Sequence, residues 1–199
     1  MELSFGLFFF DYDLDGRLDL LAANGHLESE INKVQESQHY QQPARLFWNA
    51  GAEELSEFAS VQEENCGPDL MKPIVGRGAA YADIDNDGDL DVLLTQVGGR
   101  PLLLRNDQDL GHHYLRFRLI GGRANRDAIG AWIEVRIGET ILRRQVMPTR
   151  SYLSQVELPV TIGISNNEHV DDVTVFWPDG TSQKVTDYAL DGVTVVTQQ

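Results

Sequence analysis

Two nine-residue segments of the sequence carry a high density of acids. Residues 11–19 read Asp-Tyr-Asp-Leu-Asp-Gly-Arg-Leu-Asp, and residues 83–91 read Asp-Ile-Asp-Asn-Asp-Gly-Asp-Leu-Asp. Acids at positions 1, 3, 5 and 9 of a curling loop direct their oxygens toward one point, glycine at position 6 permits a sharp turn, and position 7 offers a carbonyl. Hard oxygen donors of this kind suit Ca²⁺. Four adjacent carboxylates also repel one another strongly unless a cation neutralises them.

Other interpretations of these segments fit the residues less well. Mg²⁺ requires a stricter octahedron and keeps several waters. An EF-hand places Glu at position 12, which is Ala22 in the first segment and Leu94 in the second. Asp and Gly also cap turns through side-chain to backbone bonds without any metal. Two copies that each keep all four acids and the glycine favour two calcium sites.

The charge of the chain is unevenly distributed. Residues 1–111 carry 21 acids and 7 bases, a net of −14, whereas residues 112–199 carry 10 acids and 9 bases, a net of −1. An acidic surface repels phosphate backbones, so we expect no nucleic-acid partner and favour cations. The sequence also has no run of about 18 apolar residues, which argues against a membrane-spanning protein.

Sets of residues typical of catalysis are weak in this sequence. Ser151 and Ser154 lack a Gly-x-Ser-x-Gly context, so we expect their hydroxyls to bond in a turn. The five histidines show no His-Glu-x-x-His spacing, and His112-His113 is expected to lie in a solvated linker. His26 follows the first acidic loop, where it could pack, bond or have a function. The chain is therefore predicted not to be an enzyme.

Three further features are minor candidates. Cys66 is the only cysteine, which excludes an internal disulfide and favours an incidental thiol. The run Arg143-Arg144 with Arg150 is a weak candidate contact surface beside Ser151-Tyr152. The tryptophans, which all fall in apolar strands, are expected in the core; they are Trp48, Trp132 and Trp177.

The acidic segments belong to a longer repeat. Residues 6–21 are echoed by residues 78–93 at a constant offset of 72, and related phrases follow at 43–49 and 101–106. Each copy predicts a strand that ends near the first Asp, a tight loop, a Leu/Val strand, and an apolar strand that closes in Asn. Such units must stack, and two are too few to close a propeller, so we expect further blades in a longer parent chain.

Two other segments complete the predicted organisation. The first copy has a polar insertion over 24–42, in which Ile31 and Val34 predict a short surface helix. From about residue 112 the pattern alternates, with Leu115, Phe117 and Leu119 on one face and Arg116 and Arg118 on the other; Ala131, Ile133, Val135 and Ile137 alternate with Glu134 and Arg136 in the same way. About six half-buried antiparallel strands are predicted there, in a sandwich or barrel, with a hairpin turn at Pro178-Asp-Gly180.

Several phrases of the first half resemble the FG-GAP or VCBS repeats of β-propellers. They are residues 11–20, 23–26, 42–47, 76–80 and 83–92. Three phrases of the second half, at 125–130, 151–155 and 175–180, resemble the ASPIC/UnbV domain that ends proteins similar to cartilage acidic protein. The resemblance departs at Val156–Pro159 and Ile162–Ser165, where relatives usually carry an acidic turn and a Phe-Gly-Leu-Gly segment.

The resemblance implies an all-β chain of two domains. Residues 1–111 would form the last blades of a propeller, with a calcium ion in each acidic loop, and residues 112–199 a small antiparallel β domain. The ligands that the resemblance implies are Asp11, Asp13, Asp15 and Asp19 with the Arg17 carbonyl, and Asp83, Asp85, Asp87 and Asp91 with the Asp89 carbonyl.

The expected function is that of a non-catalytic calcium-binding module for interaction or adhesion. Ca²⁺ would stiffen the blades for contact with a protein or glycan. Because weak structural sites fill where calcium is millimolar, we expect an extracellular, periplasmic or cell-surface location, with the export signal in a preceding part of the parent chain. The alternatives are an enzyme or accessory protein of a biosynthetic pathway that uses the propeller face or His26, and a purely structural segment.

Overall fold

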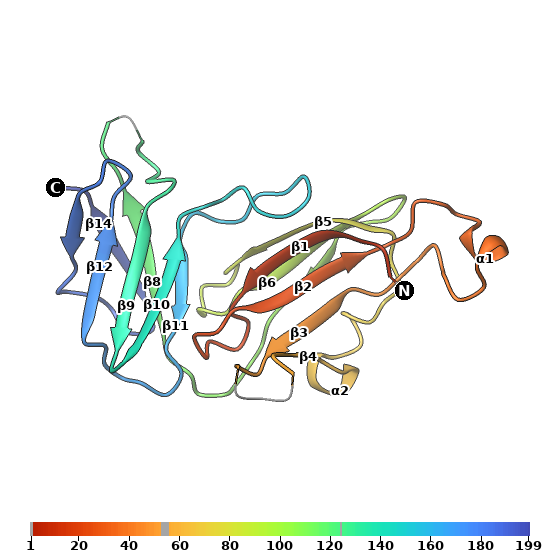
Figure 1. The fold of residues 1–199 in the computed structure, drawn as a ribbon, viewed down its shortest axis with the longest axis horizontal. Helices are drawn as coiled ribbons and strands as arrows, with labels where there is room; N and C mark the ends of the chain where they lie inside the picture. The colour runs from red at the N-terminus through yellow and green to blue at the C-terminus, as the bar shows by residue number, and fades with distance from the viewer. Residues whose placement is uncertain (1, 53–55, 124) are drawn as a thin grey trace.

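The computed structural model describes residues 2–52, 56–123 and 125–199. Two β-rich halves lie side by side along the long axis of the molecule (Figure 1). The elements of the first half are β1 (Ser4–Phe10), β2 (Asp19–Asn24), α1 (Ile31–Val34), β3 (Arg45–Asn49), β4 (Phe58–Ser60), α2 (Glu63–Cys66), β5 (Gly76–Ala82), β6 (Asp91–Gln96) and β7 (Leu102–Leu104). The predicted all-β class is confirmed, and the predicted surface helix is the single turn α1, which has no buried residue.

The first half contains two open antiparallel sheets, each built in chain order. The first has the order β1-β2-β3-β4 and the second β5-β6-β7. The strands on either side of each acidic segment are those predicted, since β1 and β2 flank residues 11–19 and β5 and β6 flank residues 83–91. Each acidic segment is thus the hairpin connection of the first two strands of its sheet.

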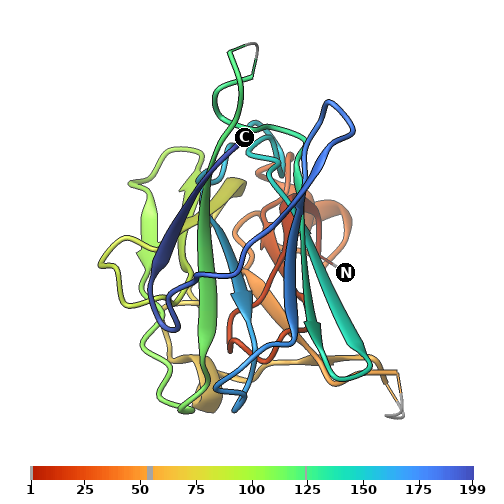
Figure 2. The same cartoon turned by 90° about the vertical axis from the view of Figure 1, so that its left-hand side faces the viewer.

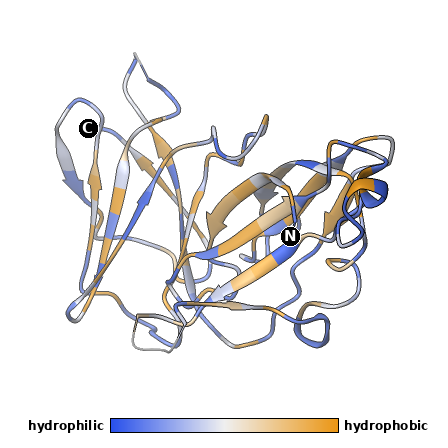
Figure 3. Cartoon of the chain, turned by 45° about the vertical axis from the view of Figure 1, so that its right-hand side comes forward, coloured by the Kyte–Doolittle hydropathy of each residue, from blue (hydrophilic) through white to orange (hydrophobic). Residues whose placement is uncertain are grey.

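The two sheets pack against each other through apolar side chains. One buried cluster joins Phe8, Phe10 and Leu21 of the first sheet to Val92 and Leu94 of the second. Hydrophobic residues accordingly lie on the strands and hydrophilic residues gather in the connections (Figure 3). The backbones come very close where β1 meets β5, because a Cβ on Gly6 would lie 2.8 Å from the Ala79 Cβ, so only glycine fits there. These contacts fix the two acidic loops at the same end of the stacked sheets.

The second half is a sandwich of two sheets, which face the viewer in Figure 2. Its strands are β8 (Tyr114–Ile120), β9 (Trp132–Ile137), β10 (Thr140–Gln145), β11 (Val160–Gly163), β12 (Asp172–Phe176), β13 (Ser182–Lys184) and β14 (Val193–Thr197). The sheet orders are β10-β9-β12-β13 and β11-β8-β14, and one apolar cluster fills the space between the sheets. The predicted turn at Pro178-Asp-Gly180 joins β12 to β13 as expected.

Two expectations for this half need correction. The strands are not all antiparallel, because β14 pairs with β8 in parallel. Arg116 was expected on a solvated face, yet it is only 4% exposed. The reason is tertiary: Arg116 Nε lies 3.6 Å from Asp83 Oδ2 of the first half, and within its own half Arg116 donates to Thr161 Oγ1 at 2.6 Å and to Glu157 Oε2 at 2.5 Å. Alternation marks two faces of a strand and cannot say that the second face is covered by another domain.

The halves are joined by a loop that follows β10 and lies over β1 and β5 (Figure 1). The Ser151 hydroxyl accepts the Leu7 backbone N–H at 3.0 Å, and the Ser154 hydroxyl accepts the Ala79 N–H at 3.1 Å. Phe5 and Tyr152 pack edge to face. These serines therefore bind the blades to the second half. Among the described residues, no helix is long and apolar enough to cross a membrane.

Candidate metal centre

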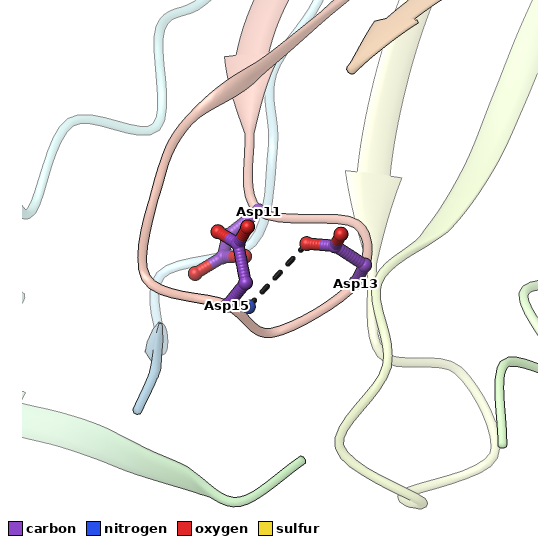
Figure 4. Close-up of side chains that lie close together, drawn as sticks. All are labelled: Asp11, Asp13 and Asp15. Carbon is purple, nitrogen blue, oxygen red and sulfur yellow. Dashed lines mark hydrogen bonds between the residues drawn. The ribbon is translucent and has the colours of Figure 1, made fainter. Parts of the chain in front are cut away.

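The first acidic loop brings three of its predicted ligands together. Carboxylate oxygens of Asp11, Asp13 and Asp15 lie within 4.8 Å of one another. The three side chains face the inside of the loop, and the Asp15 N–H donates to Asp13 Oδ1 at 3.3 Å (Figure 4). Asp11 and Asp13 are buried. The turn depends on two residues with positive φ, Leu14 at 58° and Gly16 at 92°.

Asp11 is the most enclosed of these carboxylates. Its Oδ2 accepts the N–H of Gly16 at 3.0 Å and the N–H of Gly163 at 3.2 Å, and Arg144 Nη2 lies 3.7 Å away. Its Oδ1 is buried and has no hydrogen-bond partner in the described part of the chain. A buried carboxylate oxygen without a partner is costly, which marks this position as one that a ligand would complete.

The second half of the molecule covers the first loop. Leu14, at the tip, is 2% exposed, and its carbonyl accepts the Ser165 N–H at 2.9 Å. Gly163 approaches so closely that a Cβ there would lie 2.3 Å from the Leu14 carbonyl carbon. Arg144 Nη2 donates to the Gly16 carbonyl at 2.8 Å. Residues from two domains thus fix the shape of this loop.

The second acidic loop repeats the cluster in a more open setting. Carboxylate oxygens of Asp83, Asp85 and Asp87 lie within 4.8 Å of one another, but Asp85 and Asp87 are exposed. The Asp83 side chain is only 2% exposed, and Arg116 Nε lies 3.6 Å from its Oδ2. The Asp83 Oδ1 is buried without a partner among the described residues. Position 1 therefore carries the same unsatisfied oxygen in both loops.

The acid at position 9 accepts the same two backbone hydrogen bonds in both loops. Asp19 Oδ2 accepts the Tyr12 N–H at 3.1 Å and its Oδ1 accepts the Asn49 N–H at 2.8 Å. Asp91 accepts the corresponding N–H groups of Ile84 at 2.9 Å and Asn106 at 2.9 Å. These carboxylates tie the loop to the end of the third strand and lie outside the clusters. Their role as metal ligands stays a prediction. It requires that at least one carboxylate oxygen of each residue contact the ion and a backbone N–H at the same time.

Position 7 also behaves alike in the two loops. The Arg17 N–H donates to Asp15 Oδ1 at 2.7 Å, and the Asp89 N–H donates to Asp87 Oδ1 at 3.0 Å. The Arg17 side chain adds an ion pair with Asp15. These bonds hold the chain in the curl that the spacing of the acids predicts. The carbonyl ligands of Arg17 and Asp89 stay predictions.

Comparison with known families agrees with these two halves. Residues 11–94 match the FG-GAP-like repeat, and residues 121–199 match the family ASPIC and UnbV. The chain carries an FG-GAP-like repeat followed by an ASPIC and UnbV domain. No curated protein matches the chain significantly. The family of the first half is consistent with the blade-like sheets, and both acidic loops lie within its matched residues.

Burial raises the pKa of several loop carboxyls in the FG-GAP-like repeat. Desolvation raises the pKa of Asp11 to about 8, although the Arg144 charge opposes it, and raises that of Asp19 to about 7 against two backbone hydrogen bonds. In the second loop, desolvation raises the pKa of Asp89 to about 6. The positive charges of the protein do not offset this desolvation. A bound cation would lower these pKa values again.

The remaining candidates of the sequence have structural bonds. His26 Nδ1 accepts the Glu28 N–H at 3.0 Å, so this side chain bonds within its turn. His112 and His113 were expected in a solvated linker, but His112 Nδ1 bonds the Asp13 carbonyl at 2.6 Å and His113 Nδ1 lies 2.7 Å from Asp191 Oδ2. The linker is fixed because it crosses the junction between the loops and the ASPIC and UnbV domain. Burial raises the pKa of Cys66, which keeps it a thiol.

Sequence reasoning missed the residues that the ASPIC and UnbV domain contributes to the loops. Arg144 reaches Asp11, and Arg116 with Glu157 reaches Asp83; the Asp83 N–H donates to Glu157 Oε1 at 3.3 Å. Arg144 stood out only as part of an arginine run, and nothing marked Arg116 except its place in an alternating strand. These contacts join residues at least 33 positions apart, so no local pattern could reveal them.

Proposed function

We propose that this protein is a non-catalytic calcium-binding module whose two acidic loops hold structural Ca²⁺ ions. The observation that carries the proposal is the pair of buried, unpartnered oxygens, Asp11 Oδ1 and Asp83 Oδ1. Each lies in a cluster whose other members are carboxylates. One buried oxygen without a hydrogen-bond partner could be a chance feature. The same unpartnered oxygen at position 1 of both loops supports a common ligand, and the surrounding carboxylates favour a hard cation as that ligand.

The charges around the first loop support a divalent ion. When ionised, Asp11, Asp13, Asp15 and Asp19 carry four negative charges, which Arg17 and Arg144 reduce to two. One Ca²⁺ would balance that remainder. The second loop keeps a larger excess, because Asp89 adds a fifth carboxylate and Glu157 lies beside Asp83. When bound, the ion would neutralise the clustered carboxylates and hold each hairpin in its curl.

The proposed role of the ions is to stiffen the hairpins that also meet the ASPIC and UnbV domain. A rigid junction would present a defined surface to a protein or glycan partner. We propose that further blades pack on the second sheet, where Leu93 and Leu103 stand opposite each other and are 41% and 53% exposed. Sites that need abundant calcium favour an extracytoplasmic location, which is part of the same proposal.

Thermal unfolding tests the metal proposal. The chain is unfolded in excess EDTA and in rising Ca²⁺, with Mg²⁺ as a control ion. Ca²⁺ at about 100 times its dissociation constant should add roughly 2.7 kcal/mol per site, a shift of several degrees. A double variant, Asp11→Asn with Asp83→Asn, should lose this shift. Asp69→Asn should keep it, because Asp69 pairs with Lys72 on the surface. An equal response of the double variant and the wild type would contradict the proposal.

A further inference from the structure

A cleft of about 230 Å³ lies between the FG-GAP-like repeat and the ASPIC and UnbV domain. Its lining includes four aromatic side chains and three arginines, which are Phe9, Phe10, Tyr81 and Trp132 with Arg143, Arg144 and Arg150. Clefts at domain interfaces with aromatic walls and a few convergent polar groups are typical ligand sites, and this one is below their usual size of roughly 300–1,000 Å³. Its size suits a small molecule.

The acids near the cleft are already paired. Asp11 has Arg144 at 3.7 Å, and Glu157, which also lines the cleft, has Arg116 Nη2 at 2.5 Å. Arg143 lies 2.7 Å from Glu134. These pairs leave Arg150 as the cleft arginine for which the described residues provide no carboxylate.

Arg150 is also held in place. Its Nε donates to the Met147 carbonyl at 3.0 Å and its Nη2 to the Gln145 carbonyl at 3.2 Å. A guanidinium fixed by neutral carbonyls keeps its full charge and its remaining donors for a ligand. In a chain of net charge −15, this is a local positive site at the rim of an aromatic cleft.

The aromatic side chains fit the same ligand. Trp132 was expected in the core, yet it is 44% exposed and lines the cleft. Tyr81 is half-buried and lines the same cleft, and a tyrosine hydroxyl can donate a hydrogen bond. An exposed indole, a phenyl ring and a hydroxyl donor therefore line the same cleft as a fixed guanidinium.

We propose that this cleft binds a small organic acid, a carboxylate carried on a flat apolar body. The carboxylate pairs with Arg150 and accepts a hydrogen bond from the Tyr81 hydroxyl, and the body packs against Trp132 and Phe9. This site goes beyond the proposed calcium function and does not depend on it, because Arg150 and Trp132 lie outside both acidic loops.

Three probes of one shape and different charge test the proposal. The full chain is titrated in EDTA with benzoate, benzamide and benzamidine, and binding is followed by ¹H–¹⁵N chemical-shift changes at Trp132 and Arg150. Benzoate should bind saturably and about tenfold or more tightly than neutral benzamide, since a charge-assisted pair is lost with the amide. Benzamidine should bind most weakly. Equal affinities for the three probes, or no saturable response to benzoate, would overturn the proposal.

Variants identify the contact that selects the acid. Arg150→Met should reduce the preference for benzoate over benzamide to near one, whereas Arg150→Lys should keep part of it. Tyr81→Phe should weaken benzoate binding several-fold with the fold intact, because only the hydroxyl is removed. Arg100→Met is the matched control, since this arginine is exposed in the β6–β7 turn and does not line the cleft. A benzoate preference that survives Arg150→Met in a folded chain would refute the assignment.

Discussion

The two acidic loops share one sequence pattern but occupy different environments. In the first loop, Leu14 is 2% exposed, and the ASPIC and UnbV domain covers the tip through Gly163 and Arg144. In the second loop, Asp85 and Asp87 are exposed, although the domain reaches Asp83 through Arg116 and packs Tyr114 against Gly88. The same carboxylates therefore lie at different effective dielectric, which changes their electrostatic energy by several-fold. The comparison teaches that the motif specifies which carboxylates are present, whereas the neighbouring domain decides how strongly their electrostatic energy is coupled to folding.

The largest effect should come from breaking the buried pair at the first loop. Arg144→Met removes the charge beside Asp11, and loss of one partner of a buried pair costs about 3–5 kcal/mol. We expect the lower end of that range in EDTA, because Asp11 can take up a proton, and a smaller loss in Ca²⁺ if the ion neutralises the same carboxylate. Chemical unfolding measures both values. Arg143→Met is the control, since its guanidinium is exposed and forms a surface pair with Glu134.

The next effect separates the two proposed metal sites. Asp13→Asn should abolish about 2.7 kcal/mol of calcium-dependent stabilisation at 100 times the dissociation constant, because the buried site lies between the two domains. Asp85→Asn, in the exposed loop, should remove less. Calorimetric unfolding with and without Ca²⁺ gives both losses. Equal losses in the two variants would show that burial by the ASPIC and UnbV domain does not strengthen the first site.

A tight backbone contact makes the first loop sensitive to one methyl group. Gly163→Ala places a Cβ 2.3 Å from the Leu14 carbonyl carbon, so either the loop or β11 must move. Overpacking of this kind costs about 1–3 kcal/mol, and the Asp11 hydrogen bond to the Gly163 N–H weakens with it. Gly122→Ala should be tolerated, because its Cβ would lie 3.3 Å from the movable Gln198 side chain. Unfolding in urea compares the two; equal stability would mean that β11 shifts freely.

The last comparison concerns the pH dependence of the stability of the metal-free chain. Because the folded-state pKa of Asp11 is raised to about 8, the folded chain holds a proton that the unfolded chain releases at lower pH. The contribution of Asp11 is fully present below about pH 4 and is lost as pH rises through about 8. The stability of wild type relative to Asp11→Asn should thus fall between about pH 5 and pH 8 in EDTA.

The second loop sharpens this comparison. Its Asp89 has a pKa raised only to about 6, so the same difference taken against Asp89→Asn should fall over a lower and narrower pH range. Denaturant unfolding at several pH values measures both curves. If the stability of the wild type relative to Asp11→Asn rose with pH, this result would contradict the burial of the Asp11 carboxyl.

Much of the fold followed from local patterns. The 72-residue offset identified two copies of one unit, and the strands on either side of each acidic segment formed where apolar residues precede and follow it. Alternation predicted the inward residues of β9 correctly, since Ile133 and Val135 are fully buried. It failed at Arg116 because a strand pattern has only two faces and the second one is covered by another domain. The parallel pairing of β14 with β8 has no local signal either.

The sequence by itself determined which atoms are available: clustered carboxylates at alternate positions, a glycine for the turn, and a fourth acid at position 9. These follow from spacing, because a loop of nine residues brings its own side chains together. The tertiary structure alone decided that the first loop is buried, that Arg144 and Arg116 approach Asp11 and Asp83, and that Trp132 opens onto a cleft with Arg150. Those contacts depend on how two domains pack, and packing joins residues whose distance along the chain carries no information about their distance in space.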